Sequence, residues 1–477
     1  LPAQEFGCCE IPYKKASFGR FNTWNPYERN HWGYMTSNFF APAAYYAEDW
    51  SSFKWNTWMG TSGKQVKQFK DMVKAFHNEG IAVIMDVVFN HLSEYELGNL
   101  KELDKEYYFR LDNNGNYIAE SGCGNDLKTE RPMVRRLIVE SILFWMKEYH
   151  IDGFRFDLGK LLDWETIEEI IREAKKINPN VVFVCEPWGG GYDPKGFSLR
   201  GWGAWNDQIR NGIKGENPLT GLGWIFGKWY GNNNIDRIKS YVNGTLITDK
   251  EGIFQTKEHS VNYLESHDGY TLGDFIRIGL NNSDTGRVIK DVVDYSKLNE
   301  TQLKLNKLGA LFLLTSQGMT MIHEGQEFAR AKITPFIKGI DDRHQGMIDH
   351  NTYNKDNEVN YLDYNIATQN SELLNYYKGL IKLRKTYQAF RHADYSKIEF
   401  FTNNVNEFFL GYKVKHKKEE FLVCFNANPN NAIDIKLPKG EWEIIVNGDV
   451  AGIETIKKVK NGLNIPTSTG CVLRKVK

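Results

Sequence analysis

The sequence predicts an α/β protein with a parallel sheet, followed by a smaller all-β domain. Up to about residue 395, short apolar runs rich in β-branched residues alternate with segments of helical periodicity. Such alternation is typical of parallel strands joined by helical crossovers. From residue 396 onward, apolar segments separated by polar turns predict strands only, which indicates a small sandwich.

The individual elements follow from the spacing of apolar residues. This spacing predicts a first helix over residues 66–76 that ends at Gly80, and the run at 81–88 then predicts a buried parallel strand. The polar stretch at 93–129 predicts a long loop, and loops of that length are usually functional. Further helices are predicted at 132–146, 164–177, 302–315 and 373–384, and further strands at 151–157, 181–185, 261–264, 319–322, 408–414, 421–425, 433–437 and 442–446.

The composition argues against two classes of partner. Lys+Arg and Asp+Glu both number 60, so the formal net charge is zero and no basic surface for nucleic acid is predicted. No apolar run reaches the roughly 20 residues that a membrane span needs, so no membrane partner is expected. The six cysteines are scattered without zinc spacing, which favours reduced thiols, with a bridge from Cys123 to Cys8 or Cys9 as the alternative.

Four acidic segments end or directly follow predicted strands, at residues 86–91, 153–157, 185–188 and 265–268. Parallel α/β folds gather their catalytic groups at this end of the strands. Because side chains alternate along a strand, Arg155 and Asp157 are expected on one side, where the cation keeps the carboxylate ionised as a nucleophile requires. Glu186 stands near Trp188, and an apolar neighbour favours the protonated form that a general acid requires.

Each of these residues, taken alone, also has a structural explanation. A strand-end carboxylate is more often a helix cap or a surface charge, and His91 or His267 alone is more often a structural hydrogen-bonding residue. A metal site built on His and Asp would need further ligands, and no second cluster supplies them. The functional interpretation therefore depends on the ordered recurrence of all four segments.

In order and spacing, the four segments resemble the four signature regions of the α-amylase family of glycoside hydrolases, family 13, through most of residues 1–395. The resemblance implies a (β/α)8 TIM-type barrel over residues 1–395, with a long loop insertion at about 92–130, followed by a β-sandwich domain over 396–477. It also implies an N-terminal carbohydrate-binding domain and a first strand that precede Leu1 and Pro2. We therefore expect the barrel in this chain to be truncated in its first strand.

The resemblance implies roles for the matching residues. Asp157 matches the nucleophile, Glu186 the acid/base, and Asp268 the third carboxylate, which binds sugar hydroxyls and stabilises the distorted ring. The implied mechanism is double displacement with retention, for which the two catalytic carboxyl groups lie about 5–5.5 Å apart, against about 6.5–9.5 Å for inversion. The residues that match positioning companions in subsite −1, or a mainly architectural aspartate in the last case, are Arg155, His91, His267 and Asp86.

Further segments resemble the pullulanases, isoamylases and related debranching enzymes of that family. Trp32-Gly33-Tyr34 resembles a motif whose tyrosine stacks on the sugar in subsite −1, so Tyr34 inherits that role, and Trp32 and Trp188 are expected to bind substrate. Residues 121–126, 130–133 and 324–328 also resemble pullulanase-type sequences. The implied activity is retaining hydrolysis of α-1,6 branch links in pullulan, amylopectin, glycogen or limit dextrins. The alternatives are an α-1,4-active amylase-type hydrolase or glucanotransferase, and a non-catalytic glucan-binding protein.

The remaining expectations concern cofactors, partners and compartment. No cofactor is required by the implied chemistry. Residues 112–116 would suit a structural calcium ion, although a polar turn is the commoner use of such an Asx-Gly cluster. The expected partner is a branched α-glucan, the expected state is a monomer, and the cytoplasm is favoured over secretion.

Overall fold

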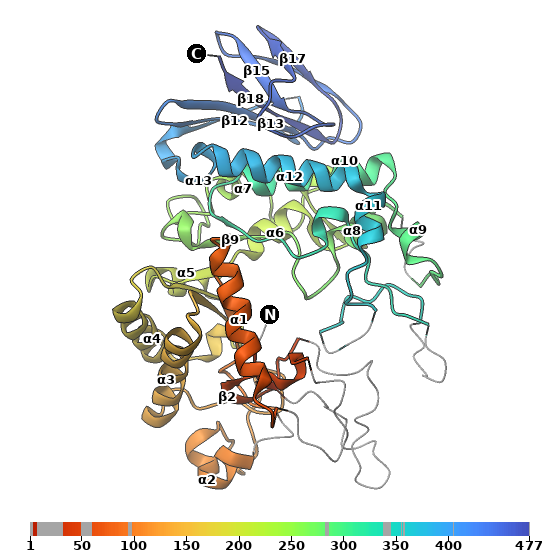
Figure 1. Cartoon of the computed structure of the whole chain (residues 1–477). Coiled ribbons are helices and arrows are strands. Elements are labelled where there is room, and N and C mark those ends of the chain that lie inside the picture. Colours follow the sequence, from red (N-terminus) through yellow and green to blue (C-terminus); the bar gives the residue numbers. More distant parts are fainter. Residues whose placement is uncertain are drawn as a thin grey trace. The chain divides into compact units, whose positions relative to one another are not determined.

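The computed structural model describes residues 3–6, 32–48, 60–93, 98–281, 286–336, 345–353, 355, 358–403 and 405–476. Contacts divide the chain into two compact units. The first comprises residues 1–205 with 353–357, and the second comprises residues 206–352 with 358–477. Figure 1 shows the elements of both units coloured by residue number.

The first unit is built around four parallel strands in the order β6-β5-β4-β3. Their bounds are β3 (Ile84–Val87), β4 (Gly153–Phe156), β5 (Val182–Cys185) and β6 (Gly203–Trp205). The register places Asp86 directly beside Arg155. The first three strands confirm the sequence predictions at shorter length. Strand β6 was not predicted because its sequence Gly-Ala-Trp lies in a Gly-rich segment without β-branched residues.

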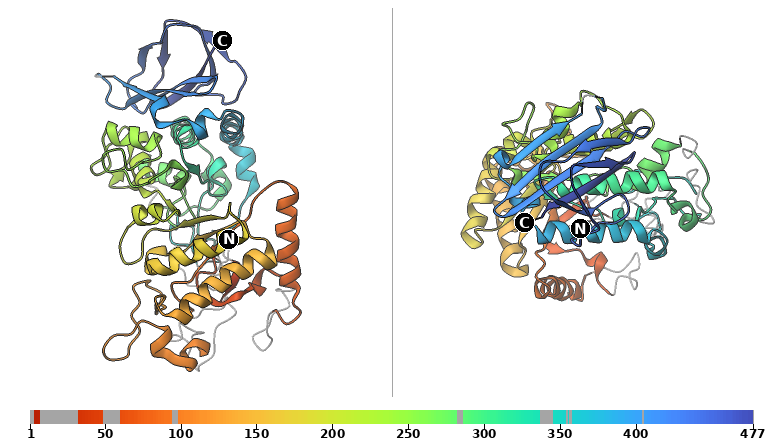
Figure 2. Two further views of the ribbon diagram at one scale, coloured as in Figure 1. Left: turned by 90° about the vertical axis from the view of Figure 1, so that its left-hand side faces the viewer. Right: turned by 90° about the horizontal axis from the view of Figure 1, so that it is seen from above.

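Helices connect these strands, and Figure 2 shows α3 and α4 running alongside each other. Helix α4 begins at Asp163, whose side chain accepts the backbone N–H of Thr166 at 3.0 Å, and it buries Ile167 and Ile170. Helices α1, α3 and α4 confirm the predictions. The bounds of the elements outside the parallel sheet are α1 (Lys64–Asn78), α2 (Gly98–Tyr108), α3 (Pro132–Tyr149), α4 (Trp164–Ile177), α5 (Pro194–Leu199), η2 (Ala44–Tyr46), η4 (Gly159–Leu161), and an antiparallel pair of β1 (Gln4–Phe6) and β2 (Thr36–Pro42).

The stretch at 93–129 is only partly loop, which corrects the sequence prediction. Helix α2 lies within it, with non-helical dihedral angles at Asp104. Its two aliphatic side chains are Leu100 and Leu103, and Leu103 is 71% exposed. The helix is short, interrupted at Asp104 and rich in charged residues, so its periodicity in the sequence is weak.

The second unit contains a short parallel pair, β9 (Ser260–Asn262) and β10 (Met319–Thr320), at two predicted strand positions. Helices α10 (Glu300–Thr315) and α12 (Ser371–Thr386) confirm two predicted helices, and a capping box of Asn299 and Gln302 begins α10. The unit's remaining elements before the β region are α6 (Asp207–Ile213), β7 (Gly215–Asn217), β8 (Gly221–Leu222), η5 (Trp224–Phe226), α7 (Ile235–Val242), η6 (Lys257–His259), α8 (Leu272–Leu280), α9 (Val292–Ser296), η8 (Gln326–Phe328), α11 (Tyr364–Gln369), α13 (Ala389–His392) and η9 (Tyr395–Lys397).

All described elements from Ile398 onward are strands, in blue in Figures 1 and 2. Six form an antiparallel sheet in the order β11-β12-β13-β18-β15-β16, and β14 pairs with β17. Leu422, Trp442 and Ile465 are buried in one core shared by the sheet and the pair, which makes the region a sandwich. The bounds are β11 (Ile398–Thr402), β12 (Phe409–His416), β13 (Glu419–Asn426), β14 (Ile433–Lys436), β15 (Trp442–Val446), β16 (Lys457–Val459), β17 (Gly462–Ile465) and β18 (Thr469–Lys475).

A buried arginine holds several backbone carbonyls of the second unit. Arg384 on α12 donates from Nη1 to the carbonyl oxygens of Leu314, Ser316 and Phe390 at 3.0, 2.8 and 2.7 Å. Its Nη2 donates to Gly318 at 2.6 Å. These carbonyls belong to the end of α10, the turn into β10 and helix α13, so one side chain joins three segments. Among the described helices, none is both long and apolar enough to cross a membrane.

We expect Arg384→Met to lower the free energy of unfolding by about 3 kcal/mol or more, because buried carbonyls lose their donors. Urea denaturation of the chain measures this loss. Lys382→Met, an exposed change on the same helix, serves as the matched control and is expected to stay within about 0.5 kcal/mol of the unchanged protein. Equal stability of the two variants would contradict the structural role of Arg384.

Candidate active site

The predicted catalytic residues of the first unit lie at the carboxyl ends of neighbouring strands. Asp157 follows β4 and donates its backbone N–H to Val87 at 3.0 Å, while Glu186 follows β5 and donates to Phe156 at 3.0 Å. Strand pairing therefore continues up to both carboxylates. The alternation predicted from the sequence is confirmed, because Arg155 contacts Asp157 while Phe154 and Phe156 pack in the aromatic core behind them.

Arg155 is the centre of the cluster. The residue is only 6% exposed. Its Nη1 lies 2.7 Å from Asp86 Oδ1 and 3.5 Å from Asp157 Oδ1, and its Nη2 forms an ion pair with Glu186 Oε1. The guanidinium also lies over the ring of Trp205, 4.6 Å from its centroid. Burial alone would lower the pKa of Arg155, but the surrounding carboxylates raise it well above its ordinary value, so the side chain stays charged.

Asp157 is held by a second donor besides the arginine. The side-chain amide of Asn90 donates to Asp157 Oδ2 at 3.0 Å and to its backbone oxygen at 2.9 Å. Burial raises the pKa of Asp157 and outweighs the lowering by Arg155. The cation therefore acts in the direction expected from the sequence, but the expectation omitted the larger cost of removing the carboxylate from water.

Glu186 is buried, and both of its carboxyl oxygens have partners. Oε1 contacts Arg155, and Oε2 accepts the backbone N–H of Leu158 at 3.1 Å. A hydrogen bond from the Glu186 side chain favours the ionised form of Asp157 and lowers its pKa. Trp188 is half-buried and meets Trp205 edge-on at 5.9 Å between ring centroids.

Tyr34 and His91 join the same cluster. The hydroxyl of Tyr34 donates to Asp86 Oδ2 at 2.8 Å and accepts from Arg155 Nη1 at 3.3 Å. His91 is completely buried, with Nε2 2.8 Å from the Tyr34 carbonyl oxygen and Nδ1 against the side-chain oxygen of Asn90. Burial lowers the pKa of His91 to about 4, so the ring is neutral at neutral pH. The neutral ring carries one N–H, so it can donate a hydrogen bond to only one of these two oxygens.

The structure brings together six of the predicted site residues. The positions of the others relative to this cluster stay predictions. Tyr34, Asp86, His91, Arg155, Asp157 and Glu186 are joined by the contacts above, with Trp188 close to them. Trp32 is half-buried, and its backbone N–H donates to Tyr353 at 3.0 Å. His267 and Asp268 follow β9 in the second unit, where Nε2 and Oδ2 are 3.4 Å apart. Their position beside Asp157 stays a prediction.

Sequence reasoning missed two residues of the cluster. Asn90 lies in the segment 86–91, but an amide next to a histidine carries no distinctive signal of its own. Trp205 lies in the Gly-rich aromatic segment 201–206, where composition alone could not separate core from sugar-binding rings. The structure shows that Trp205 covers Arg155, so the ring supports the charged cluster directly.

The possible calcium site and the possible disulfide concern other parts of the chain. Asp112 accepts the backbone N–H groups of Asn114 and Asn116 at 2.8 and 2.9 Å and the Asn116 side-chain amide at 3.0 Å, which is the geometry of an Asx turn. No cluster of three or more His, Cys, Asp or Glu that could hold a metal occurs among the described residues. Cys123 is half-buried, and Cys8 and Cys9 lie outside the described residues, so the disulfide stays a prediction.

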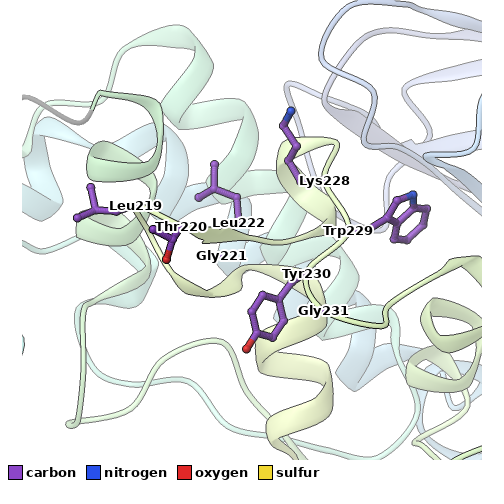
Figure 3. Close-up of a pocket in the computed structure, with 8 residues that line it drawn as sticks. All are labelled: Leu219, Thr220, Gly221, Leu222, Lys228, Trp229, Tyr230 and Gly231. Carbon is purple, nitrogen blue, oxygen red and sulfur yellow. The ribbon is translucent and has the colours of Figure 1, made fainter.

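A hollow of 390 Å³ in the second unit lies outside the predicted site (Figure 3). Its aromatic side chains have partners within the protein. Trp229 stacks on Phe408 at 4.9 Å and donates from Nε1 to Glu407 at 2.9 Å, and the Tyr230 hydroxyl donates to Glu216. We therefore assign no chemistry to this hollow. Its lining residues are Leu219, Thr220, Gly221, Leu222, Lys228, Trp229, Tyr230 and Gly231.

The chain is similar to proteins named pullulanase and isoamylase. The chain is 28% identical to a pullulanase of Bacillus subtilis over 436 residues, covering 87% of this chain and 54% of that protein. It is 27% identical to an isoamylase of Flavobacterium over 465 residues, with the same shares covered. It therefore spans about half the length of these two relatives. The solved structure of a pullulanase from Paenibacillus barengoltzii, complexed with maltohexaose and α-cyclodextrin, matches with a TM-score of 0.77 and 26% identity over 100% of this chain and 69% of that one.

These relatives are glycoside hydrolases of the debranching type. They support a TIM-type barrel with an additional β domain as the fold of this chain. No family model matches the sequence. The similarity supports a debranching-type enzyme of the α-amylase family of glycoside hydrolases, family 13.

Replacing Arg155 tests the electrostatics of the cluster. Because Arg155 lowers the pKa of Asp157, we expect Arg155→Gln to raise that pKa and to move the acid limb of kcat/KM upward by about one to three pH units. The measurement is the pH profile of pullulan hydrolysis.

Two controls separate charge from folding. Arg136→Gln, at an exposed arginine paired with Glu140, is expected to leave the pH profile unchanged. Arg155→Lys keeps the charge and is expected to return the acid limb toward its original position. An acid limb that does not move in a folded Arg155→Gln variant would contradict the role assigned to this cation.

Proposed function

We propose that the chain hydrolyses α-1,6 branch links of α-glucans with retention of configuration. The observation that carries the proposal is the burial of Asp157 and Glu186 on one arginine at adjacent strand ends. Retaining glycosidases use two such carboxyl groups, one as nucleophile and one as acid/base. The proposed substrate class rests on relatives named pullulanase and isoamylase.

The contacts of each carboxyl group suit its proposed role. Glu186 protonates the glycosidic oxygen while Asp157 attacks the anomeric carbon, so the leaving sugar departs and a glycosyl-enzyme forms. Water then attacks the same carbon, and Glu186 takes its proton as base. Asp157 needs to be ionised for the first step, and Arg155 with the amide of Asn90 favours that form.

The remaining predicted residues complete the proposed sugar site. Tyr34 is fixed at its hydroxyl by Asp86 and Arg155, and we assign its ring to stacking on the sugar in subsite −1. Asp268 is proposed as the third carboxylate, with His267 beside it. We propose that the reaction needs no cofactor, since proton transfer and nucleophilic attack are both supplied by side chains.

The α-1,6 specificity is favoured over the two alternatives. An α-1,4-active hydrolase or glucanotransferase would share the same carboxylates, but the relatives are of the debranching type. A non-catalytic glucan-binding protein would have no need of a nucleophile and an acid at one buried cation. Both alternatives give a different result in the assay below.

We expect Asp157→Asn to lower reducing-end release from pullulan by about a thousandfold or more, because the amide cannot form the covalent intermediate. The control is Asp71→Asn, at an exposed carboxylate on α1, which should keep full activity. Activity that survives Asp157→Asn would contradict the mechanism. Release from linear amylose without release from pullulan would instead contradict the α-1,6 specificity.

A further inference from the structure

Lys332 of the second unit is buried beneath the turn that carries Asp268. The residue is 1% exposed. Its ammonium donates to the carbonyl oxygen of His267 and, at 3.2 Å, to that of Gly269. The lysine thus binds the two residues on either side of Asp268.

A third side chain completes the support of this turn. Ser266 Oγ donates to the carbonyl oxygen of Asp268 at 3.3 Å. Three consecutive carbonyls, from His267 to Gly269, are therefore held by side chains. Gly269 has φ +76°, a left-handed conformation that favours glycine, so the turn is tight. The Asp268 side chain itself is 58% exposed, which leaves a fixed backbone with an accessible carboxylate.

The buried carboxylate of Asp274 anchors the backbone of Lys332. Its backbone N–H donates to Asp274 Oδ2 at 2.8 Å, and Asp274 also pairs with Arg277 at 3.1 Å. Asp274 belongs to α8, which begins directly after the turn at Thr271. Thr271 Oγ1 in turn donates to the carbonyl oxygen of Arg330 at 2.9 Å. The segment 330–332 is thus joined to the start of α8 at two points that follow the turn.

A buried lysine is a costly way to hold a loop, because removing an ammonium from water costs several kcal/mol unless it is paired and hydrogen-bonded. The charges of Glu265, Asp268 and Asp274 raise the pKa of Lys332, but burial outweighs them, and the resulting pKa is about 8. An apolar side chain would fill the same space without this cost, but it would leave two carbonyls of the turn without donors. The placement of this charge directly under Asp268 therefore points to a role at the site.

We propose that Lys332 is a positioning residue, which acts by fixing the backbone on both sides of Asp268 so that this carboxylate meets the sugar in one orientation. The proposal rests on the proposed function, in which Asp268 is the third carboxylate. Sites of this kind depend on such supporting contacts, because small displacements of a catalytic group are costly.

A double-mutant cycle tests whether Lys332 acts through Asp268. We expect Lys332→Met to lower kcat on pullulan about tenfold or more in the unchanged chain, but by less than about twofold in an Asp268→Asn background. Lys332→Arg keeps the donors and is expected to retain more activity than Lys332→Met. Lys304→Met, at a lysine on α10 paired with Glu300, is the matched control. A loss of equal size in both backgrounds would overturn the proposal.

Hydrogen exchange provides a readout that needs neither activity nor a fully stable variant. In the full chain, Lys332→Arg and Lys332→Gln are compared with the unchanged protein for exchange in the peptide that spans residues 265–271. We expect the amides there to exchange about tenfold faster in Lys332→Gln, whose shorter side chain loses the charged donor, with a smaller change in Lys332→Arg. Unchanged exchange in Lys332→Gln would overturn the proposal. If the unchanged chain releases no sugar from pullulan, the proposed function fails, whereas the exchange result still decides whether Lys332 holds the turn.

Discussion

The charged pairing of one buried arginine with three carboxylates is the interaction on which the site depends. Arg155 contacts Asp86, Asp157 and Glu186 from the middle of β4. Removing such a cation would leave three carboxylates in a medium where an unpaired charge costs several kcal/mol. Trp205 covers the guanidinium and excludes water from it. The strands can therefore keep these acidic groups together only while the arginine is present.

The same constraint explains the acid–base chemistry proposed for the site. One positive charge cannot compensate three negative charges in a buried place, so the cluster favours retaining a proton. Burial raises the pKa of Asp157, while Arg155 and hydrogen bonds from Asn90 and Glu186 lower it. The hydrogen bond from Glu186 lowers the pKa of Asp157, which suits the proposed roles of Glu186 as acid and Asp157 as nucleophile.

Much of the fold could be predicted because its signals are local. Strand β4 and helix α4 have clear periodicity, and a two-residue period was sufficient to place Arg155 and Asp157 on one side. Strand β6 and helix α2 could not be predicted, since a Gly-rich strand and a short, interrupted, highly charged helix carry only a weak pattern.

The residues of the site that the sequence did not reveal all act through tertiary contacts. Asn90 and Trp205 act through contacts made across 67 and 50 residues of sequence, respectively, and no local pattern reports such contacts. The pKa of Asp157 was expected to be low because the sequence shows the neighbouring arginine but not the burial. Lys332 is likewise distant in sequence from the turn that it supports.

The proposed mechanism requires that Asp157 forms a covalent bond with the sugar. Incubation with a fluorinated α-glucosyl fluoride, which forms a glycosyl-enzyme faster than the enzyme hydrolyses it, followed by mass spectrometry of proteolytic peptides, tests it most directly. If Asp157 is the nucleophile, one glycosyl group is added per chain, and it is located at Asp157. A glycosyl group located at another carboxylate would contradict it, as would the absence of any adduct in a preparation that actively hydrolyses pullulan.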